Sequence, residues 1–443
     1  MASRVAIIAG VIIVIVIIAA LAFITTSQQP QPTTTVSPTP QPTPAQTAQT
    51  QQRPTVTVKI GCLFDLTGAT SDVGVPWSVG VKGAIQAINN GELTELAKLG
   101  IKIECVERDY AYRIPEAQAA YEFFKQQGVV AIIGWGTGDT LALAPSINRD
   151  KIPYFSASYT VTLTVNPYNF FAVVSYQDAA IAAVRFVKQY FQQKGLPAKM
   201  ALTYPNVPYG IEPLPAIRAE AKRQGVEICD EEIVELTAAS AREQITRIKE
   251  KCGDNVAIWW GGTTAAGVVI LRDMDALGLD NAIFIANVWG ANERLSKALG
   301  PELTSKLGGR VYRVTSIMMI DEMKKLASQG IPDAQLFVKY VKAEEEPAVR
   351  GWHTAFVLAK AIEKLAKEGK EITGPNIKNA LETMGPISVP YAATIEYKPD
   401  DHRPTMETWI YVMNKDGTWS RVTTITIERP PFDYYGLEIK PVG

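Results

Sequence analysis

The chain has 443 residues, of which 47% are hydrophobic and 20% charged, enough for about two or three domains with sizeable cores. Lys and Arg number 44 against 45 Asp and Glu, and this balance gives no indication of a nucleic-acid partner. The two histidines, His353 and His402, are isolated, and neither a CxxC nor an HExxH spacing occurs. We therefore expect no metal site of His and Cys ligands.

The N-terminal segment predicts export and membrane anchoring. Residues 5–24 form an uncharged apolar run of about 20 residues, long enough to cross a bilayer as a helix. Arg4 precedes the run and no basic residue follows until Arg53, so the positive-inside bias places the rest of the chain outside the cell. A cleaved signal peptide, cut at the small residues 20–22, is the alternative. We favour a transmembrane anchor over residues 1–24, because the run exceeds the usual signal core of about 7–15 residues.

Residues 25–54 predict an extended stalk. Thr, Gln, Pro and Ser supply most of this segment, with one charge and no aromatic side chain. Such a composition cannot bury enough apolar surface to offset the entropy lost on ordering. At about 3.1 Å per residue its greatest reach is on the order of 90 Å, which suits a tether.

The body of the chain alternates short apolar strands with helices, and this order starts twice. Continuous apolar strands joined by crossover helices predict parallel sheets covered on both faces, so the fold class is α/β with two similar lobes. In the first series we expect strands at 56–63, 101–106, 129–133 and 154–156 with helices at 77–89, 115–127 and 140–149. In the second we expect strands at 199–203, 227–234, 256–259 and 282–286 with helices at 242–251 and 264–277.

The C-terminal third adds helices and a hairpin. Helices are expected at 332–343, 352–367 and 375–383 after a strand at 310–316. Strands at 409–413 and 421–427 are joined by a hairpin turn at 414–417. Strands so late in the chain are expected at the edge of an earlier sheet.

Ligands of open parallel sheets bind outside the carboxyl ends of the strands, so the loops leaving those ends are the candidate site. The glycine-rich loop Gly134–Thr140 runs into a helix, and the free amides of a helix start attract an anion. A small carboxylate fits this loop, with the Thr137 hydroxyl as a donor; a flexible turn is the alternative. The polar loop Ser156–Thr160 follows the next strand.

Aromatic side chains in these loops could line the apolar part of a pocket, although core packing is equally compatible with each of them: Trp77, Tyr209, Trp260 and Trp289. Covalent catalysis has little support, because no GxSxG motif and no Cys/His pair in a recognisable context occur. Asp65 and Asp109 at strand ends could form a carboxylate pair. We favour solvated rim residues that cap loops.

Export to an oxidising compartment makes disulfides plausible. Cys62 and Cys105 lie at matching depths on strands expected to be neighbours, and Cys229 with Cys252 is the other natural pairing. Spacing alone leaves buried free thiols open.

Several segments taken in order resemble the type I periplasmic binding proteins of the leucine/isoleucine/valine-binding family, which feed ABC importers. They are 60–89, 130–160 with its glycine loop, Tyr209–Gly210 and 260–279, and the likeness extends from Val56 to the C-terminal hairpin. The resemblance implies two Rossmann-like lobes joined by a three-strand hinge. Lobe 1 would hold 55–169 and 314–386, and lobe 2 would hold 170–313 and 387–443. The anchor and stalk resemble the archaeal way of holding such a protein at the cell surface.

The resemblance also implies the ligand-binding residues. Thr137, Gly138, Ser158 and Thr160 would hold a ligand carboxylate, with Tyr209 and Thr263 closing from the other lobe. Tyr159 and Trp289 complete the expected set. Relatives that bind α-amino acids often carry an acid for the ammonium group after the strand at 282–286. Here that stretch reads Asn287–Gly290, with no carboxylate before Glu293.

The expected function is that of a monomeric, surface-anchored solute-binding protein without a cofactor or metal. It would bind a branched-chain amino acid or a related amide or carboxylate by hinge closure and deliver it to an ABC permease. A ligand-sensing receptor of the same fold, an exported enzyme and a structural surface protein are the alternatives.

Overall fold

The structure is a computed structural model that describes residues 55–440. The predicted anchor and stalk lie outside the described residues. Within 55–440, no helix combines the length and the apolar character that crossing a membrane would require.

Five parallel strands form the first sheet, in the order β2-β1-β3-β4-β5. We call this sheet and the helices packed on it lobe 1. The strands are β1 (Val56–Phe64), β2 (Ile101–Asp109), β3 (Ala131–Ile133), β4 (Tyr154–Phe155) and β5 (Asn169–Phe170). The connecting helices are α1 (Ser71–Asn89), α2 (Ile114–Gln126) and α3 (Thr137–Asp150).

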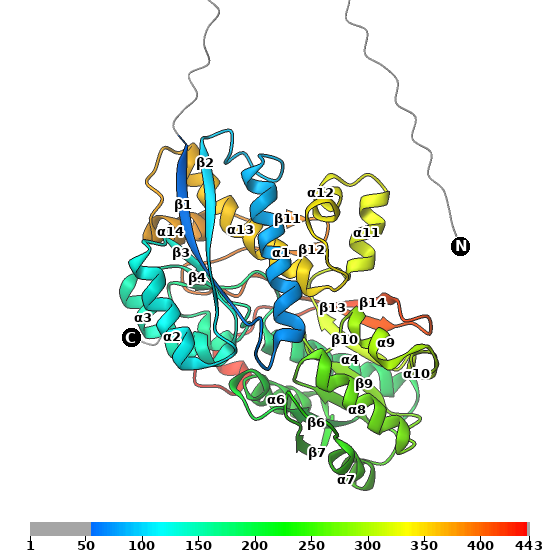
Figure 1. Ribbon diagram of the computed structural model, residues 1–443. Coiled ribbons are helices and arrows are strands. Elements are labelled where there is room, and N and C mark those ends of the chain that lie inside the picture. Colours follow the sequence, from blue (N-terminus) through cyan, green and yellow to red (C-terminus); the bar gives the residue numbers. More distant parts are fainter. Residues whose placement is uncertain (1–54, 441–443) are drawn as a thin grey trace, which may run out of the picture. The chain divides into compact units, whose positions relative to one another are not determined.

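The second sheet repeats this strand order. Its parallel part has the order β7-β6-β8-β9-β10. When the strands are numbered within each series, both sheets have the order 2-1-3-4-5. We call this sheet and its helices lobe 2. The strands are β6 (Lys199–Tyr204), β7 (Glu227–Ile233), β8 (Ala257–Trp260), β9 (Ile283–Ala286) and β10 (Val311–Thr315). The helices are α4 (Tyr176–Gln193), α5 (Pro208–Ile211), α6 (Leu214–Gln224), α7 (Arg242–Cys252), α8 (Thr264–Ala276), α9 (Glu293–Leu299) and α10 (Pro301–Leu307). The prediction of two similar series of strands is confirmed (Figure 1).

The predicted C-terminal hairpin is confirmed as an edge addition. β13 (Glu407–Met413) pairs antiparallel with β10, and β14 (Trp419–Thr426) pairs with β13 at the edge of the second sheet. A short 3₁₀ helix at Phe432–Tyr435 then packs against α6.

The segment between β10 and β13 returns to lobe 1. It contains α11 (Ile320–Ser328), α12 (Pro332–Tyr340), α13 (Pro347–Lys367), α14 (Gly374–Thr383) and a small hairpin of β11 (Ile387–Val389) and β12 (Ala392–Ile395). Helix α13 packs closely along α1: a Cβ placed on Gly351 would lie 2.0 Å from the backbone oxygen of Trp77. The residue boundaries of the two lobes stay a prediction.

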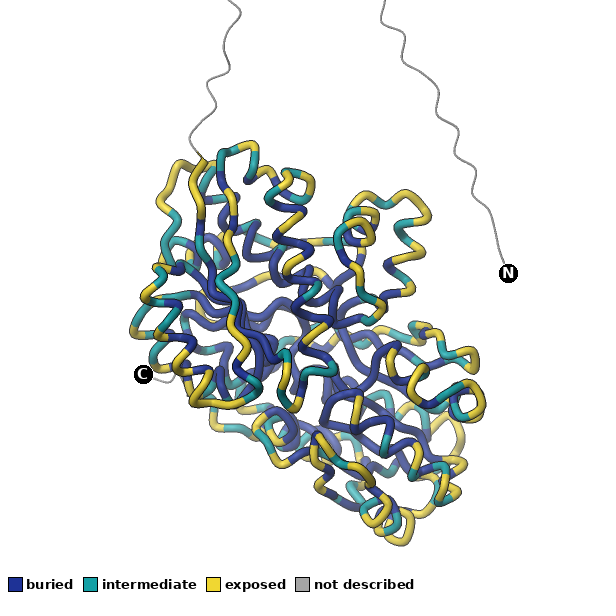
Figure 2. Tube along the Cα trace, viewed as in Figure 1, coloured by how far each residue is buried: buried dark blue, intermediate teal, exposed yellow. Residues whose placement is uncertain are grey.

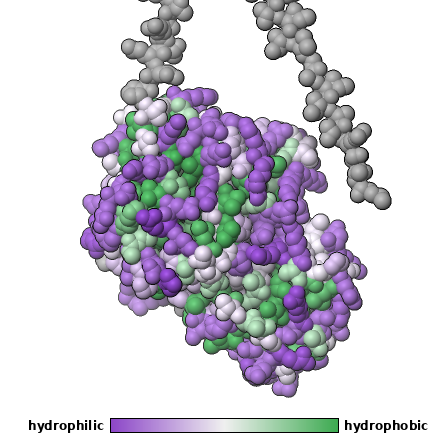
Figure 3. Space-filling model, in the orientation of Figure 1, coloured by the Kyte–Doolittle hydropathy of each residue, from purple (hydrophilic) through white to green (hydrophobic). Residues whose placement is uncertain are grey.

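Buried side chains follow the strands of both sheets and the region where the lobes meet, while the outer loops and helix faces are exposed (Figure 2). The face shown in Figure 3 is mainly hydrophilic with scattered apolar patches. The two cysteine pairings that the sequence left open are both present as disulfides: Cys62–Cys105 joins β1 to β2, and Cys229–Cys252 joins β7 to the end of α7.

Candidate ligand-binding site

A small cavity lies where the loops of the two lobes meet. Its volume is about 20 Å³, little more than a water molecule requires. It is lined by Thr70, Val73, Tyr112, Trp135, Gly136, Thr137, Ala157, Tyr176, Tyr209, Thr263 and Trp289. Most of these residues follow the carboxyl end of a parallel strand in one lobe or the other, which is where an open parallel sheet binds its ligands.

Helix α3 begins at the cavity. Thr137 is its first residue, and its N-cap Gly136 provides no side chain to satisfy the first amides. These amides and the helix dipole favour an anion at this point. The Ser158 hydroxyl donates to Thr137 Oγ1 at 2.8 Å, which orients the threonine side chain.

Aromatic rings form the larger part of the wall. The rings of Trp135 and Trp289 lie 5.2 Å apart, and so do those of Tyr176 and Tyr209. Trp289 Nε1 donates to the Tyr176 hydroxyl at 3.2 Å, and the Tyr209 hydroxyl donates to the backbone oxygen of Gly262 at 2.9 Å. These bonds join rings from distant parts of the chain into one wall with defined ring orientations.

The loop between β2 and α2 brings Tyr112 to the cavity at a cost in backbone energy. Ala111 and Tyr112 have φ of 48° and 58°, a left-handed conformation that non-glycine residues seldom adopt. Strain of this kind concentrates at binding sites, where the surrounding structure holds it in place.

A buried charge cluster lies behind the aromatic wall. The Arg350 guanidinium is 4.7 Å from the ring centroid of Trp289 and 5.7 Å from that of Tyr159. Its Nε donates to Glu346 Oε1 at 2.7 Å, and Arg313 lies 3.3 Å from the other oxygen of Glu346. Each of these charged groups is buried, so their pairing is what makes burial tolerable.

The carboxylates of Asp65 and Asp109, at the ends of β1 and β2, accept hydrogen bonds from loop amides. Asp65 accepts hydrogen bonds from the amides of Gly68 (2.6 Å) and Thr70 (2.9 Å), and Asp109 accepts from the Leu66 amide at 3.0 Å. The expectation that both are solvated is wrong for Asp65, which is fully buried. Hydrogen bonds within its own loop replace the water that its carboxylate loses.

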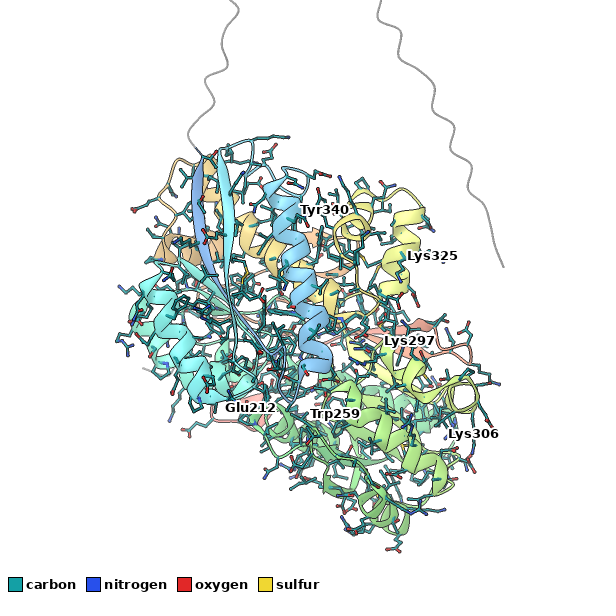
Figure 4. The ribbon with its side chains drawn as sticks, in the orientation of Figure 1. Glu212, Trp259, Lys297, Lys306, Lys325 and Tyr340 are labelled. Atoms are coloured by element: carbon teal, nitrogen blue, oxygen red, sulfur yellow. A yellow bond between two sulfur atoms is a disulfide. The ribbon has the colours of Figure 1, made fainter. Side chains whose placement is uncertain are left out.

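The two lobes are in contact on both sides of the cavity. Glu212, after α5, accepts hydrogen bonds from the hydroxyls of Thr160 (2.6 Å) and Thr162 (3.1 Å) in lobe 1. Lys297 of α9 forms an ion pair with Glu344. Figure 4 shows Glu212 and Lys297 at separate points of the boundary between the lobes.

A third contact joins the first turns of two helices. Asp72 of α1 accepts a hydrogen bond from the Ala265 amide of α8 at 2.8 Å, so a lobe 1 carboxylate lies at the N-terminus of a lobe 2 helix. Burial raises the pKa of Asp72.

The expected ligand-binding residues occupy three kinds of position. Thr137, Tyr209, Thr263 and Trp289 line the cavity. Ser158 and Tyr159 lie directly behind it, Ser158 bonded to Thr137 and Tyr159 stacked on Trp289 at 5.4 Å. Thr160 is turned to Glu212, and Gly138 faces Pro208 of α5, with 3.6 Å from its Cβ position to the proline ring.

Trp77 and Trp260, for which the sequence left pocket lining and core packing open, are packed in the core. Trp77 contacts Phe64 and Trp135, with ring centroids 5.6 and 5.2 Å away. Trp260 Nε1 donates to the backbone oxygen of Thr263 at 2.8 Å, and the tryptophan does not line the cavity.

The cavity also contains residues that sequence reasoning missed: Thr70, Val73, Tyr112, Trp135, Gly136, Ala157 and Tyr176. Most of them lie in strand-end loops that were expected to form the site. Their place in those loops was the sequence signal that could have identified them. Tyr176 opens α4, a helix that the sequence reading did not include.

Residues 55–440 contain no group of three His, Cys, Asp or Glu side chains placed to hold a metal ion.

Comparison with known proteins agrees with this geometry. Residues 57–418 match the family described as periplasmic binding protein. The chain belongs to this family. Its members are solute-binding proteins and not enzymes. A comparison with curated proteins found no match.

Solved structures share the fold over nearly their whole length. The substrate-binding protein of an ABC transporter from Aeropyrum pernix is 28% identical with a TM-score of 0.76, covering 87% of this chain and 100% of that one. A branched-chain amino acid ABC transporter protein from Thermus thermophilus with bound valine is 21% identical (TM-score 0.73; 85% and 98% covered). A solute-binding protein from R. palustris in complex with 4-hydroxybenzoate is 17% identical (TM-score 0.69; 85% and 99% covered).

Proposed function

We propose that this protein is the extracytoplasmic solute-binding protein of an ABC importer. Residues 1–24 anchor it in the cell membrane, and the stalk 25–54 holds the two lobes outside the cell. It captures a small polar solute, a branched-chain amino acid or a related amide or carboxylate, and delivers it to the permease. The Aeropyrum pernix relative, a substrate-binding protein of an ABC transporter, supports the transport role.

The observation that carries the proposal is a single cavity lined by strand-end loops of both lobes. A solute that contacts both lobes binds the closed form more tightly than the open form, so it shifts the equilibrium toward closure. At about 20 Å³ the cavity is too small for an amino acid, so the lobes must separate, or side chains must move, to admit one.

In this proposal the position of each residue determines its role in binding. Thr137 and the first amides of α3, including that of Gly138, hold a carboxylate, while Tyr209, Thr263 and Trp289 close over the solute from lobe 2. Ser158 and Tyr159 position Thr137 and Trp289, and Thr160 stabilises the closed form through Glu212.

A thermal-shift screen against amino acids, amides, urea and small carboxylates tests the binding role. A solute present at 100 times its dissociation constant should stabilise the protein by about 2.7 kcal/mol. The stabilisation should fall by about half in Thr137→Ala, because a 10-fold weaker affinity leaves the solute at about 10 times its dissociation constant. It should be retained in Thr246→Ala, which changes a partly exposed threonine on α7. Absence of any shift across the panel, with protein freed of co-purified solute, would contradict the proposal.

Reconstitution with the partner permease and ATPase tests the transport role. We expect uptake of the identified solute to require this protein. Solute binding without uptake would instead favour the sensing receptor.

A further inference from the structure

We propose that the site takes a carboxylate that has no ammonium group: an aromatic or branched aliphatic monocarboxylate, in preference to the corresponding α-amino acid. This inference rests on the proposed function, because it names the class of solute for that same cavity.

The cavity wall offers an ammonium group no charged partner. Its residues are threonines, tyrosines, tryptophans, a valine, a glycine and an alanine, and none is acidic. An ammonium group enclosed there would lose its water without gaining an ion pair, which is strongly unfavourable.

Two carboxylates of lobe 1 near the cavity are bonded elsewhere. Asp65 is held by the amide and hydroxyl of Thr70. Asp72 faces the other lobe, where it accepts from the Ala265 amide. Asp65 uses both of its oxygens within its own loop, so it could not bind an ammonium group without releasing that loop. Asp72 keeps one buried oxygen without a partner, but its side chain does not line the cavity.

Two further acids, Asp139 and Glu293, do not line the cavity. Asp139 in the first turn of α3 accepts from the Tyr110 hydroxyl at 2.8 Å, and burial raises its pKa to about 7. Glu293 accepts from the amides of Ile320 (2.7 Å) and Glu346 (2.8 Å). Glu293 thus joins separate segments of the chain instead of facing the solute.

One ring of the aromatic wall, Trp289, already faces a cation. The Arg350 guanidinium lies 4.7 Å from the Trp289 ring centroid and is fully buried. The negative ring face of Trp289 is therefore already engaged by a fixed positive charge, which would repel a second cation placed at the same tryptophan.

A carboxylate, in contrast, meets donors. The N-cap Gly136 has no side chain to bond the first amides of α3, and the Asp139 carboxylate engages those of Gly136 and Asp139, so the amides of Thr137 and Gly138 are the ones left for a solute. Thr137 Oγ1 accepts from Ser158, which leaves its own O–H to donate. Apart from Thr70 and Thr263, the remaining wall is apolar or aromatic, with Val73, Ala157 and the rings of Trp135 and Trp289. The rest of the solute should therefore be a ring or a branched chain.

Calorimetric titration of the full-length protein with matched pairs tests the inference. The pairs are 4-methylpentanoate with leucine and 3-phenylpropanoate with phenylalanine, and 4-methylpentanamide replaces the carboxylate by a neutral amide. We expect the acid to bind at least about 10-fold more tightly than the amino acid in at least one pair, and more tightly than the amide. Thr137→Val should weaken acid binding by about 10-fold, while Thr246→Val should not.

The outcomes separate the inference from the proposed function. If neither acid binds more tightly than its matched amino acid, while leucine or phenylalanine binds, the inference is overturned and the binding role stays intact. Binding of the amide as tight as that of the acid would also overturn it. If none of these molecules binds, both the inference and the proposed small-solute site are contradicted.

Discussion

Thr137 and Asp139 share the first turn of α3 but face opposite environments. Thr137 lines the cavity, whereas Asp139 points into the protein, where it meets the Tyr110 hydroxyl. Burial raises the pKa of Asp139 to about 7, so its ionised form is disfavoured in the folded protein. Burial also raises the pKa of Glu293 to about 7.

Asp139 therefore makes stability depend on pH. Because its folded pKa lies above the unfolded value of 3.8, its contribution is fully present below that value and is lost as pH rises toward about 7. The loss should be on the order of 1 kcal/mol per pH unit. Urea unfolding between pH 4.5 and 7.5 should show a weaker decline in Asp139→Asn than in the wild type, with part of the decline remaining through Glu293. Identical slopes would contradict this.

Removing the Thr137 hydroxyl tests its role in binding. Thr137→Val keeps the shape of the side chain and removes the donor, so affinity for the solute found by screening should fall by about 10-fold. Calorimetry measures the change, and unfolding in urea checks that the valine is tolerated beside Ser158. An unchanged dissociation constant would show that the hydroxyl does not contact the solute.

Helices α1 and α13 form the rigid support of the lobe 1 side of the site. α1 starts at the cavity with Val73, and α13 carries Arg350 to the back of Trp289. Their close approach depends on glycine: a Cβ on Gly80 would lie 1.9 Å from the Ala348 oxygen, and one on Gly351 would lie 2.0 Å from the Trp77 oxygen.

Gly351→Ala should therefore force the two helices apart and destabilise the protein by about 1–3 kcal/mol. Gly138→Ala is the matched control, because its Cβ would meet nothing nearer than 3.6 Å and alanine favours a helix. Urea denaturation of the three proteins measures the difference. Equal stability of Gly351→Ala and Gly138→Ala would argue against a close helix contact.

The closed arrangement of the lobes rests on unequal contacts. Glu212 receives hydroxyl hydrogen bonds from Thr160 and Thr162 at the edge of the cavity. The Lys297–Glu344 pair is exposed to solvent, where an ion pair contributes little.

Glu212→Ala should shift the protein toward the open form, whereas Lys297→Ala should change it little. Small-angle scattering should give a larger radius of gyration for Glu212→Ala without solute, and calorimetry a several-fold weaker affinity, since closure is part of binding. A larger opening in Lys297→Ala than in Glu212→Ala would reverse this assignment.

Local sequence patterns predicted much of the fold. The alternation of apolar strands and helices, started twice, was enough for two sheets, and the late hairpin could only extend an existing edge. The loops at the strand ends followed from the parallel arrangement, and four of the expected site residues line the cavity within them. Helix α4 was missed, and with it Tyr176.

Strand and helix periodicity and turn residues act over a few neighbouring positions, so these local patterns were sufficient to predict the order of the elements and the loops that meet between the lobes. Tertiary structure decided which side chains face the cavity. α1 begins at Ser71, before Pro76, and packing against Phe64 buries Trp77 while Trp135 lines the wall. Arg350 reaches Trp289 only because α13 returns to pack on α1, a contact between distant residues that no local pattern encodes.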